Sequence, residues 1–84
     1  MHDHDIHDLP IVITLHAAAR LAMRFDLDAE GVQRAIKTAQ VIRPVRKEGT
    51  VGILEKRGRK RRIRFVVTIR EGCLVIITAA EVRK

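Results

Sequence analysis

The 84-residue sequence contains no Ser, Asn, Trp or Tyr, and its one cysteine is Cys73. A serine nucleophile and a tyrosine acid or base are therefore excluded, and a lone cysteine cannot form a disulfide within the chain. No apolar run approaches the roughly 18 residues that a membrane-spanning helix needs, so we expect no membrane association. The first residues also lack the basic and then apolar pattern of a secretory signal, which favours a cytoplasmic location.

Positive charge is abundant but unevenly distributed. The chain has 17 Lys and Arg against 10 Asp and Glu, which gives a formal net charge of +7. Residues 1–42 hold six acids and four Lys or Arg (net −2), whereas residues 43–84 hold four acids and thirteen Lys or Arg (net +9). A chain of this length forms one domain with a modest core, so an oligomer or a partner is expected.

The strongest local signal is a basic run in which seven of the nine residues from Lys56 to Arg64 are Lys or Arg. Such a density of charge attracts polyanions by Coulomb steering and counterion release. The alternative is a solvated hairpin whose charges only aid solubility. We expect a nucleic-acid-binding surface that comprises Lys56, Arg57, Arg59, Lys60, Arg61, Arg62, Arg64 and Arg70.

Residues 1–10 are expected to form a flexible tail, and residues 11–84 a single domain. The tail is rich in His and Asp, namely His2, Asp3, His4, Asp5, His7 and Asp8. Structural metal sites draw their ligands from separated, ordered segments, so a frayed polar terminus is favoured over a zinc or nickel site. The sequence therefore points to no metal and no cofactor.

Two short helices are expected in the first half of the chain. Thr14 is a suitable N-cap for a helix through about Phe25, and Asp28 is one for a second helix through about Ala39. The expected buried sides comprise Leu15, Ala18, Leu21, Ala22 and Phe25 in the first helix and Leu27, Val32, Ala35, Ile36 and Ala39 in the second. His16, Arg20 and Arg24 recur every four residues and form a polar stripe on the first helix.

After Gln40 the apolar residues recur with the period of two that is typical of strands. Four segments, 41–47, 50–56, 60–70 and 73–80, are separated by Glu48-Gly49, Arg57-Gly58 and Glu71-Gly72. Glycine supplies the positive φ that tight hairpin turns require. Pro44 cannot donate a ladder hydrogen bond, which predicts that the first of these strands lies at an edge. Residues 11–13 are apolar and indicate one further small strand.

The third strand alternates, with Ile63, Phe65, Val67 and Ile69 on the side expected to face the helices. Its other side carries Arg62, Arg64, Thr68 and Arg70, so we expect this face to be partly open and lined by arginine. The last strand is apolar on both faces, which predicts a central position. The expected fold class is α+β, with two N-terminal helices packed on one face of a small antiparallel sheet of three to four strands.

Three short motifs spread over residues 14–80 are shared with a known family. They are Leu15-His16-Ala17 with Arg20 and Arg24; residues 28–32 leading to Ile36 and to residues 41–44; and residues 64–68 followed by residues 74–78. Together they resemble a small domain-of-unknown-function family within the RelE-like toxin superfamily. That family usually has Gly before the second helix, where this chain has Asp26.

The resemblance implies a RelE-like, metal-independent endoribonuclease of a toxin–antitoxin pair that acts on RNA or ribosome-bound RNA. His16, the one histidine outside the tail, is then the candidate general acid or base. Arg20 would orient the phosphate, and Arg64 would stabilise its developing charge. The alternative for His16, Arg20 and Arg24 is a solvated helix face.

Two other functions stay open on the sequence. One is a noncatalytic nucleic-acid-binding module, which would contact the backbone because the chain has few aromatic side chains to stack on bases. The other is a basic interaction domain that is neutralised by an acidic partner, such as an antitoxin segment added along an edge strand. A homodimer through an exposed strand is the related expectation.

Overall fold

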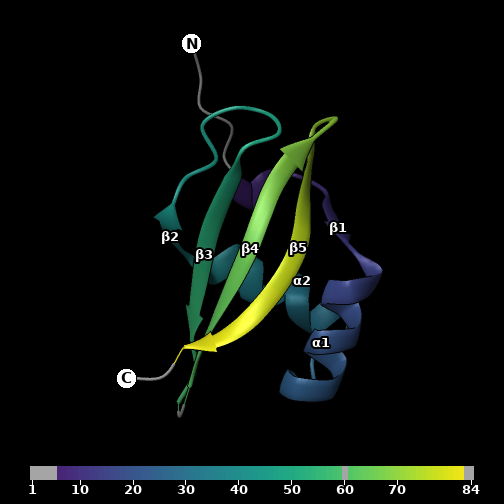
Figure 1. The fold of residues 1–84 in the computed structure, drawn as a ribbon. Coiled ribbons are helices and arrows are strands. Elements are labelled where there is room, and N and C mark those ends of the chain that lie inside the picture. Colours follow the sequence, from purple (N-terminus) through teal and green to yellow (C-terminus); the bar gives the residue numbers. More distant parts are fainter. Residues whose placement is uncertain (1–5, 60, 83–84) are drawn as a thin grey trace.

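A computed structural model describes residues 6–59 and 61–82. They form two α-helices and one sheet, which confirms the α+β class. The elements in chain order are η1 (Ile6–Asp8), β1 (Ile11–Ile13), α1 (Leu15–Phe25), α2 (Ala29–Thr38), β2 (Gln40–Arg43), β3 (Val51–Arg57), β4 (Arg62–Arg70) and β5 (Cys73–Val82). Figure 1 shows the long strands β3, β4 and β5 side by side, with no helix on the face toward the viewer.

The sheet is mixed and five-stranded, so the predicted antiparallel sheet of three to four strands is wrong in these two respects. Its order is β1-β5-β4-β3-β2, and the pairs from β2 to β5 are antiparallel. β1 pairs parallel with β5, where Val12 lies opposite Val75. The N–H of Leu74 donates to the Pro10 carbonyl oxygen, and the N–H of Thr14 donates to that of Ile76, so β1 is held at both ends.

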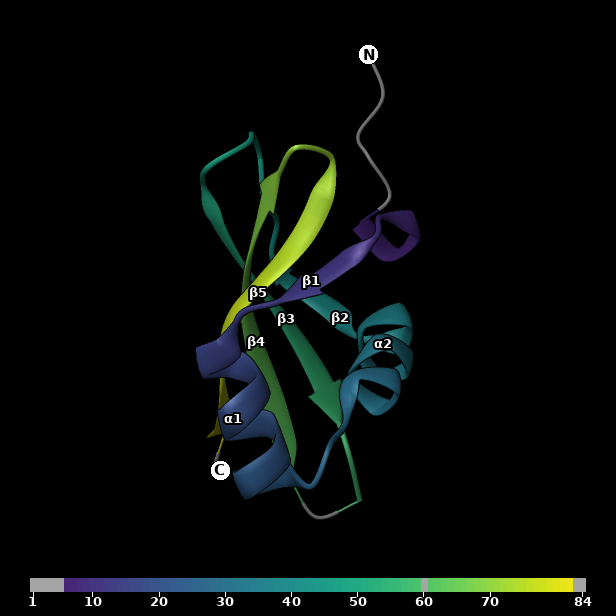
Figure 2. The same ribbon diagram turned by 90° about the vertical axis from the view of Figure 1, so that its right-hand side faces the viewer.

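The two helices cover different parts of the sheet. α2 lies behind the sheet. α1 lies beside the C-terminal half of β5, beyond the residues that pair with β1 (Figure 1). Figure 2, viewed from that edge, shows α1 nearest to the viewer and α2 set to one side of the strands. The predicted packing of both helices on one face therefore describes α2 well and α1 only in part. One core joins the two helices and the sheet, formed by Ala17, Leu21, Phe25, Val32, Ala35, Ile36, Ala39, Leu54, Phe65, Val67, Leu74, Ile76 and Ala79.

The first helix begins at the predicted cap. The Thr14 hydroxyl accepts a hydrogen bond from the Ala17 N–H (3.1 Å) and donates one to the Ile77 carbonyl oxygen on β5 (3.1 Å). Six residues further along the chain, Arg20 Nε donates to the Ala79 carbonyl oxygen (3.2 Å). These two contacts satisfy carbonyl groups on the edge of β5 that no strand covers, and they fix the rotation of α1.

This rotation differs from the predicted one. Ala17, Leu21 and Phe25 are buried, whereas Leu15 is 91% exposed, and Ala18 and Ala22 are exposed as well. The helix is apolar around most of its circumference, so its periodicity alone did not select the buried side. The hydrogen bonds of Thr14 and Arg20 to β5 made that selection.

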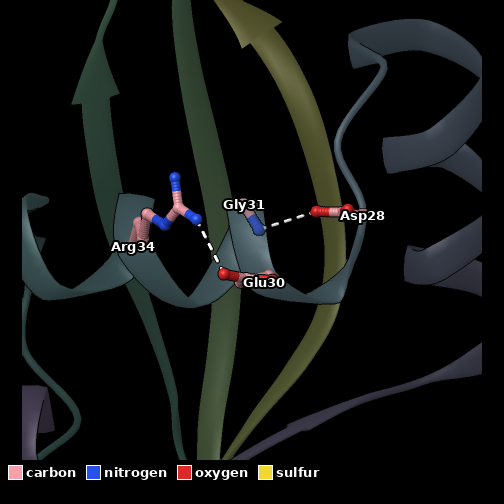
Figure 3. Close-up of polar contacts among 4 residues, drawn as sticks. All are labelled: Asp28, Glu30, Gly31 and Arg34. Carbon is pink, nitrogen blue, oxygen red and sulfur yellow. Dashed lines mark hydrogen bonds and ion pairs between the residues drawn. The ribbon is translucent and has the colours of Figure 1, made fainter.

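The second helix matches its sequence prediction closely. The Asp28 carboxylate accepts a hydrogen bond from the Gly31 N–H (2.8 Å), and Arg34 pairs with Glu30 one turn earlier (2.7 Å), as Figure 3 shows. Val32, Ala35 and Ile36 are buried. The cap and the apolar face depend on residues close in sequence, which explains why the prediction succeeded.

Asp26 ends α1 in the left-handed conformation, with φ of 54°. Glycine is favoured at such a position because it has no Cβ, and an acidic side chain at a helix C-terminus opposes the helix dipole. We expect Asp26→Gly to raise the free energy of unfolding by about 0.5–1 kcal/mol. Urea denaturation monitored by far-UV circular dichroism measures this change, and Asp26→Ala, which keeps a Cβ, should give less than half of it.

The strand predictions hold for β3, β4 and β5 within two residues, but β2 is shorter than expected. It ends at Arg43, directly before Pro44, and it is an edge strand as predicted. β5 lies inside the sheet between β1 and β4. Val66 pairs with Thr78 and Val67 with Ile76, so Ile77 is an extra, bulged residue that turns its carbonyl toward Thr14.

The expected tail is described from Ile6 onward. Ile6–Asp8 forms a 3-10 turn, Ile6 and Leu9 pack against the core, and His7 Nε2 donates to the Ala39 carbonyl oxygen (3.0 Å). His2, Asp3, His4 and Asp5 lie outside the described residues.

Candidate nucleic-acid interface

The β3–β4 hairpin carries most of the basic run, and its register determines where each side chain lies. Residues directly opposite each other in a sheet share a face. Arg57 pairs with Arg62, and Glu55 pairs with Arg64. These four side chains lie on the open face, because the alternate residues Leu54 and Phe65 are fully buried on the helix side. We call Arg57, Arg62, Arg64 and Glu55 the basic cluster.

Glu55 lies at the centre of the basic cluster and is 4% exposed, although neither helix of the described part of the chain covers this face. Its carboxylate accepts a hydrogen bond from Arg64 Nε (2.9 Å), and Arg57 Nε lies 3.9 Å from its other oxygen. The hydrogen bond from Arg64 and the positive charges of Arg64, Arg62 and Arg57 lower the pKa of Glu55, against the opposing effect of burial. Glu55 therefore stays ionised and organises the arginines around it.

This lowered pKa predicts a pH dependence of stability. A group whose pKa is lower in the folded protein contributes stability above its unfolded-state pKa, and the contribution disappears as the pH falls through the folded-state value. The ordinary value for Glu55 is 4.5, so the contribution should be complete at pH 7 and decline below about pH 4.5. Glu55→Gln should be less stable than the wild type at pH 7, and the difference should shrink at pH 3.5. Urea unfolding at the two pH values measures it, and a constant difference would contradict the assigned ion pair.

Two residues of the basic run turn toward the helices instead. Lys56 Nζ donates to Thr38 Oγ1 on α2 (2.7 Å). Arg61 donates to the Arg24 carbonyl oxygen at the end of α1 (3.2 Å), and its guanidinium lies 5.3 Å from the centre of the Phe25 ring. Lys56 and Arg61 thus tie the hairpin to both helices. The predicted single surface of the basic run is accordingly divided between two faces of the molecule.

Arg70 lies on the open face but far from the basic cluster. It is eight residues from Arg62 on the same strand, a separation of about 26 Å at the rise of a β-strand. Between them the face carries Val66 and Thr68 rather than arginine. The expected arginine-lined face is therefore basic at its two ends and apolar in its middle.

The predicted catalytic residues do not share a site. His16 is exposed on the first turn of α1, and Arg20 bonds to the outer edge of β5. Arg64 lies on β4 and points toward Glu55 of β3, on the side away from β5. About two strand spacings, or roughly 10 Å, separate β3, toward which the Arg64 side chain points, from β5, to which Arg20 bonds. Within the described part of the chain, no hydrogen bond or ion pair joins any two of these three residues.

Glu55 was not among the residues predicted from the sequence, although the sequence contains a signal for it. The hairpin turn is closed by a hydrogen bond from the Gly58 N–H to the Arg61 carbonyl oxygen. Counting outward from Gly58 and Arg61 by the same number of residues on each strand places Glu55 opposite Arg64. An acid inside a basic run is then expected to pair across the hairpin. Of the predicted binding residues, Arg59 is exposed in the turn, and Lys60 lies outside the described residues.

Comparisons with protein families, with curated proteins and with solved structures found no match. Within residues 6–59 and 61–82, no group of three His, Cys, Asp or Glu side chains has the arrangement of a metal site. In the same residues, neither α-helix has the length and apolar character needed to cross a membrane. The basic cluster is therefore the feature of the molecule from which we infer a function.

Proposed function

We propose that the protein binds the phosphate backbone of RNA through Arg57, Arg62 and Arg64 of the basic cluster, with Arg59 of the adjacent turn. The observation that carries this proposal is the contact between Arg64 and Glu55. Arg64 donates to the carboxylate through Nε, which leaves its terminal nitrogens for a ligand. A guanidinium held in this way matches the oxygens of a phosphate and loses little conformational freedom on binding.

The net charge of the site supports a polyanionic ligand. Three arginines surround one glutamate, which leaves an excess of two positive charges on this part of the open face. The site offers no aromatic ring, because both phenylalanines of the chain, Phe25 and Phe65, are buried in the core. Binding through backbone phosphates, without stacking on bases, follows from this composition.

Fluorescence polarisation with labelled single-stranded and duplex RNA tests the proposal. The logarithm of the binding constant should fall linearly with the logarithm of the salt concentration, with a slope of about −0.7 to −0.9 for each phosphate contact. We expect a slope between about −2 and −4 from the arginines named above. An affinity that does not change with salt would contradict backbone recognition.

The second candidate is the metal-independent endoribonuclease that the RelE-like resemblance implies, in a cytoplasmic protein with RNA or ribosome-bound RNA as substrate. It is favoured by the position of Glu55, a proton acceptor surrounded by groups that stabilise negative charge. The pKa of Glu55 is lowered by its arginine neighbours, which makes it a weaker base than an ordinary carboxylate and favours binding without cleavage. Incubation with free RNA and with ribosomes carrying message, in the presence of EDTA, decides between them. Cleavage that is lost in Glu55→Gln or His16→Ala would establish the enzyme and identify its base.

A further inference from the structure

The open face of the sheet carries an apolar band between its two basic ends. The band crosses four strands and comprises Val12, Val75, Val66, Ile53 and Val51, and the buried Thr68 lies between Val75 and Val51. Cross-strand pairing aligns Val12 with Val75 and Ile53 with Val66, all on the side opposite the core. Val12 and Val51 are 46% and 48% exposed, and the other three are half-buried. In Figure 1, no helix or strand within residues 6–59 and 61–82 covers this face.

A shallow hollow continues the band at the β2 side of the sheet. It is lined by Ile42, Arg43, Pro44, Arg46, Thr50 and Val51. Val51 belongs to both surfaces, so the band and the hollow are continuous. Apolar side chains therefore extend from β1 to the β2–β3 loop and end beside two arginines.

The charges around this surface are mostly of one sign. Arg57, Arg62 and Arg64 border the band on the side of the β3–β4 turn, and Arg43 and Arg46 border it at the hollow. Glu55 is already paired with Arg64. Other acids near this face, Glu48 and Glu71, lie in the turns at the far end of the sheet, where the Glu71 N–H donates to the Glu48 carboxylate.

A second copy of this chain does not fit such a surface. Two copies meeting through their bands would bring the arginines of one against the arginines of the other, or against apolar side chains, and like charges in contact oppose association. The complementary occupant has an apolar side for the band and acidic side chains for the arginines. An amphipathic helix has this shape, and its length would span the strands of the band.

We infer that the open face docks an amphipathic helix of a partner protein, with acidic residues that pair with Arg57, Arg62 and Arg64 and with the arginines of the hollow. Docked in this way, the helix covers the basic cluster. The partner therefore competes with RNA. This competition rests on the proposed RNA binding, whereas the docking of the helix does not.

The experiment uses three synthetic helical peptides of 18 residues and the whole protein. The first has leucine on one side and glutamate on the rest, the second has lysine in place of glutamate, and the third has glutamine in place of leucine. We expect the first peptide alone to bind in calorimetry, and to release labelled RNA from the protein. Failure of the first peptide to bind, or equal binding of the lysine peptide, would overturn the proposal.

Matched variants locate the docking surface. Val12→Thr with Val51→Thr keeps the side-chain shape but adds two hydroxyls to the band, and it should weaken peptide binding about tenfold without changing RNA binding. The control variant Leu15→Gln with Met23→Gln alters two side chains of α1 that are 91% and 86% exposed. It should leave peptide binding and RNA binding unchanged. Loss of peptide binding in the α1 variant but not in the band variant would assign the docking surface to α1 and contradict the proposal. Weak RNA binding by the wild type, with peptide docking intact, would count against the proposed function alone.

Discussion

Replacement of Arg57 and Arg62 together by alanine is expected to weaken RNA binding about 30-fold at 0.1 M salt, because two phosphate contacts and their released counterions are lost. The slope of the salt dependence should become shallower by about 1.5. Both arginines lie opposite each other on the open face, and neither is the hydrogen-bonded partner of Glu55. The folded structure should therefore persist, which circular dichroism and thermal unfolding check.

The matched control removes the same amount of charge elsewhere. Arg34 and Lys37 are exposed on α2, which lies behind the sheet. Their replacement by alanine lowers the net charge by two, as in the test variant, but we expect RNA affinity to change less than threefold, since only long-range attraction is lost. Equal losses in the two double variants would mean that the net charge of the protein, rather than the basic cluster, attracts RNA.

Arg64 is less suitable for this test, although it belongs to the same cluster. Its removal leaves the Glu55 carboxylate buried without its hydrogen-bond donor. Loss of one partner of a buried ion pair destabilises a protein far more than loss of an exposed charge. A weaker RNA affinity in Arg64→Ala would therefore combine unfolding with a lost contact.

Gly52→Ala is expected to lower the free energy of unfolding by about 2–3 kcal/mol, the largest effect we predict for a single substitution. Gly52 is buried on the helix side of β3, opposite Val67. A Cβ atom at this position would lie 2.7 Å from the Arg43 carbonyl oxygen, 2.7 Å from a methyl of Val45 and 3.0 Å from the Val45 N–H nitrogen. Two of these atoms belong to the backbone, so rotation of a side chain cannot relieve the overlap. The β2–β3 loop would have to move away from the core.

Chemical denaturation measures this loss, with Gly58→Ala as the control. A Cβ at Gly58 would lie 3.2 Å from one atom, the Arg61 carbonyl oxygen, in an exposed turn. We expect a cost of less than about 1 kcal/mol there, since the turn can adjust. If Gly52→Ala cost no more than Gly58→Ala, the loop would not pack over β3 as described. Because Arg43 and Arg46 lie in this segment, Gly52→Ala should also weaken docking of the glutamate peptide.

Much of the local structure follows from residues that are close in sequence. Thr14 and Asp28 cap their helices as predicted, and Pro44 marks the end of an edge strand. The turns at Gly49 and Gly72 have φ of 88° and 73°, so they use the conformation for which glycine was expected. In each case a side chain or a backbone preference acts within a few residues, and no distant contact is needed to express it.

The candidate site was predictable only in part. The concentration of arginine and lysine between residues 56 and 64 identified the hairpin, but a strand places successive side chains on opposite faces. Lys56 therefore turns to α2 while Arg57 stays on the open face. The importance of Glu55 depends on the exact cross-strand register, which the turn determines and which a count of charges does not contain.

The sequence by itself determined the helix caps, the order of the strands from 40 onward, the glycine turns and the basic hairpin, since these are properties of short segments. Only the tertiary structure decided the rotation of α1, the parallel pairing of β1 with β5, the separation of His16 from Arg64 and the burial of Glu55. Each of these depends on contacts between residues far apart in the chain, such as Thr14 with Ile77 or Arg20 with Ala79. The free energy of such contacts selects one arrangement among several that local preferences allow equally.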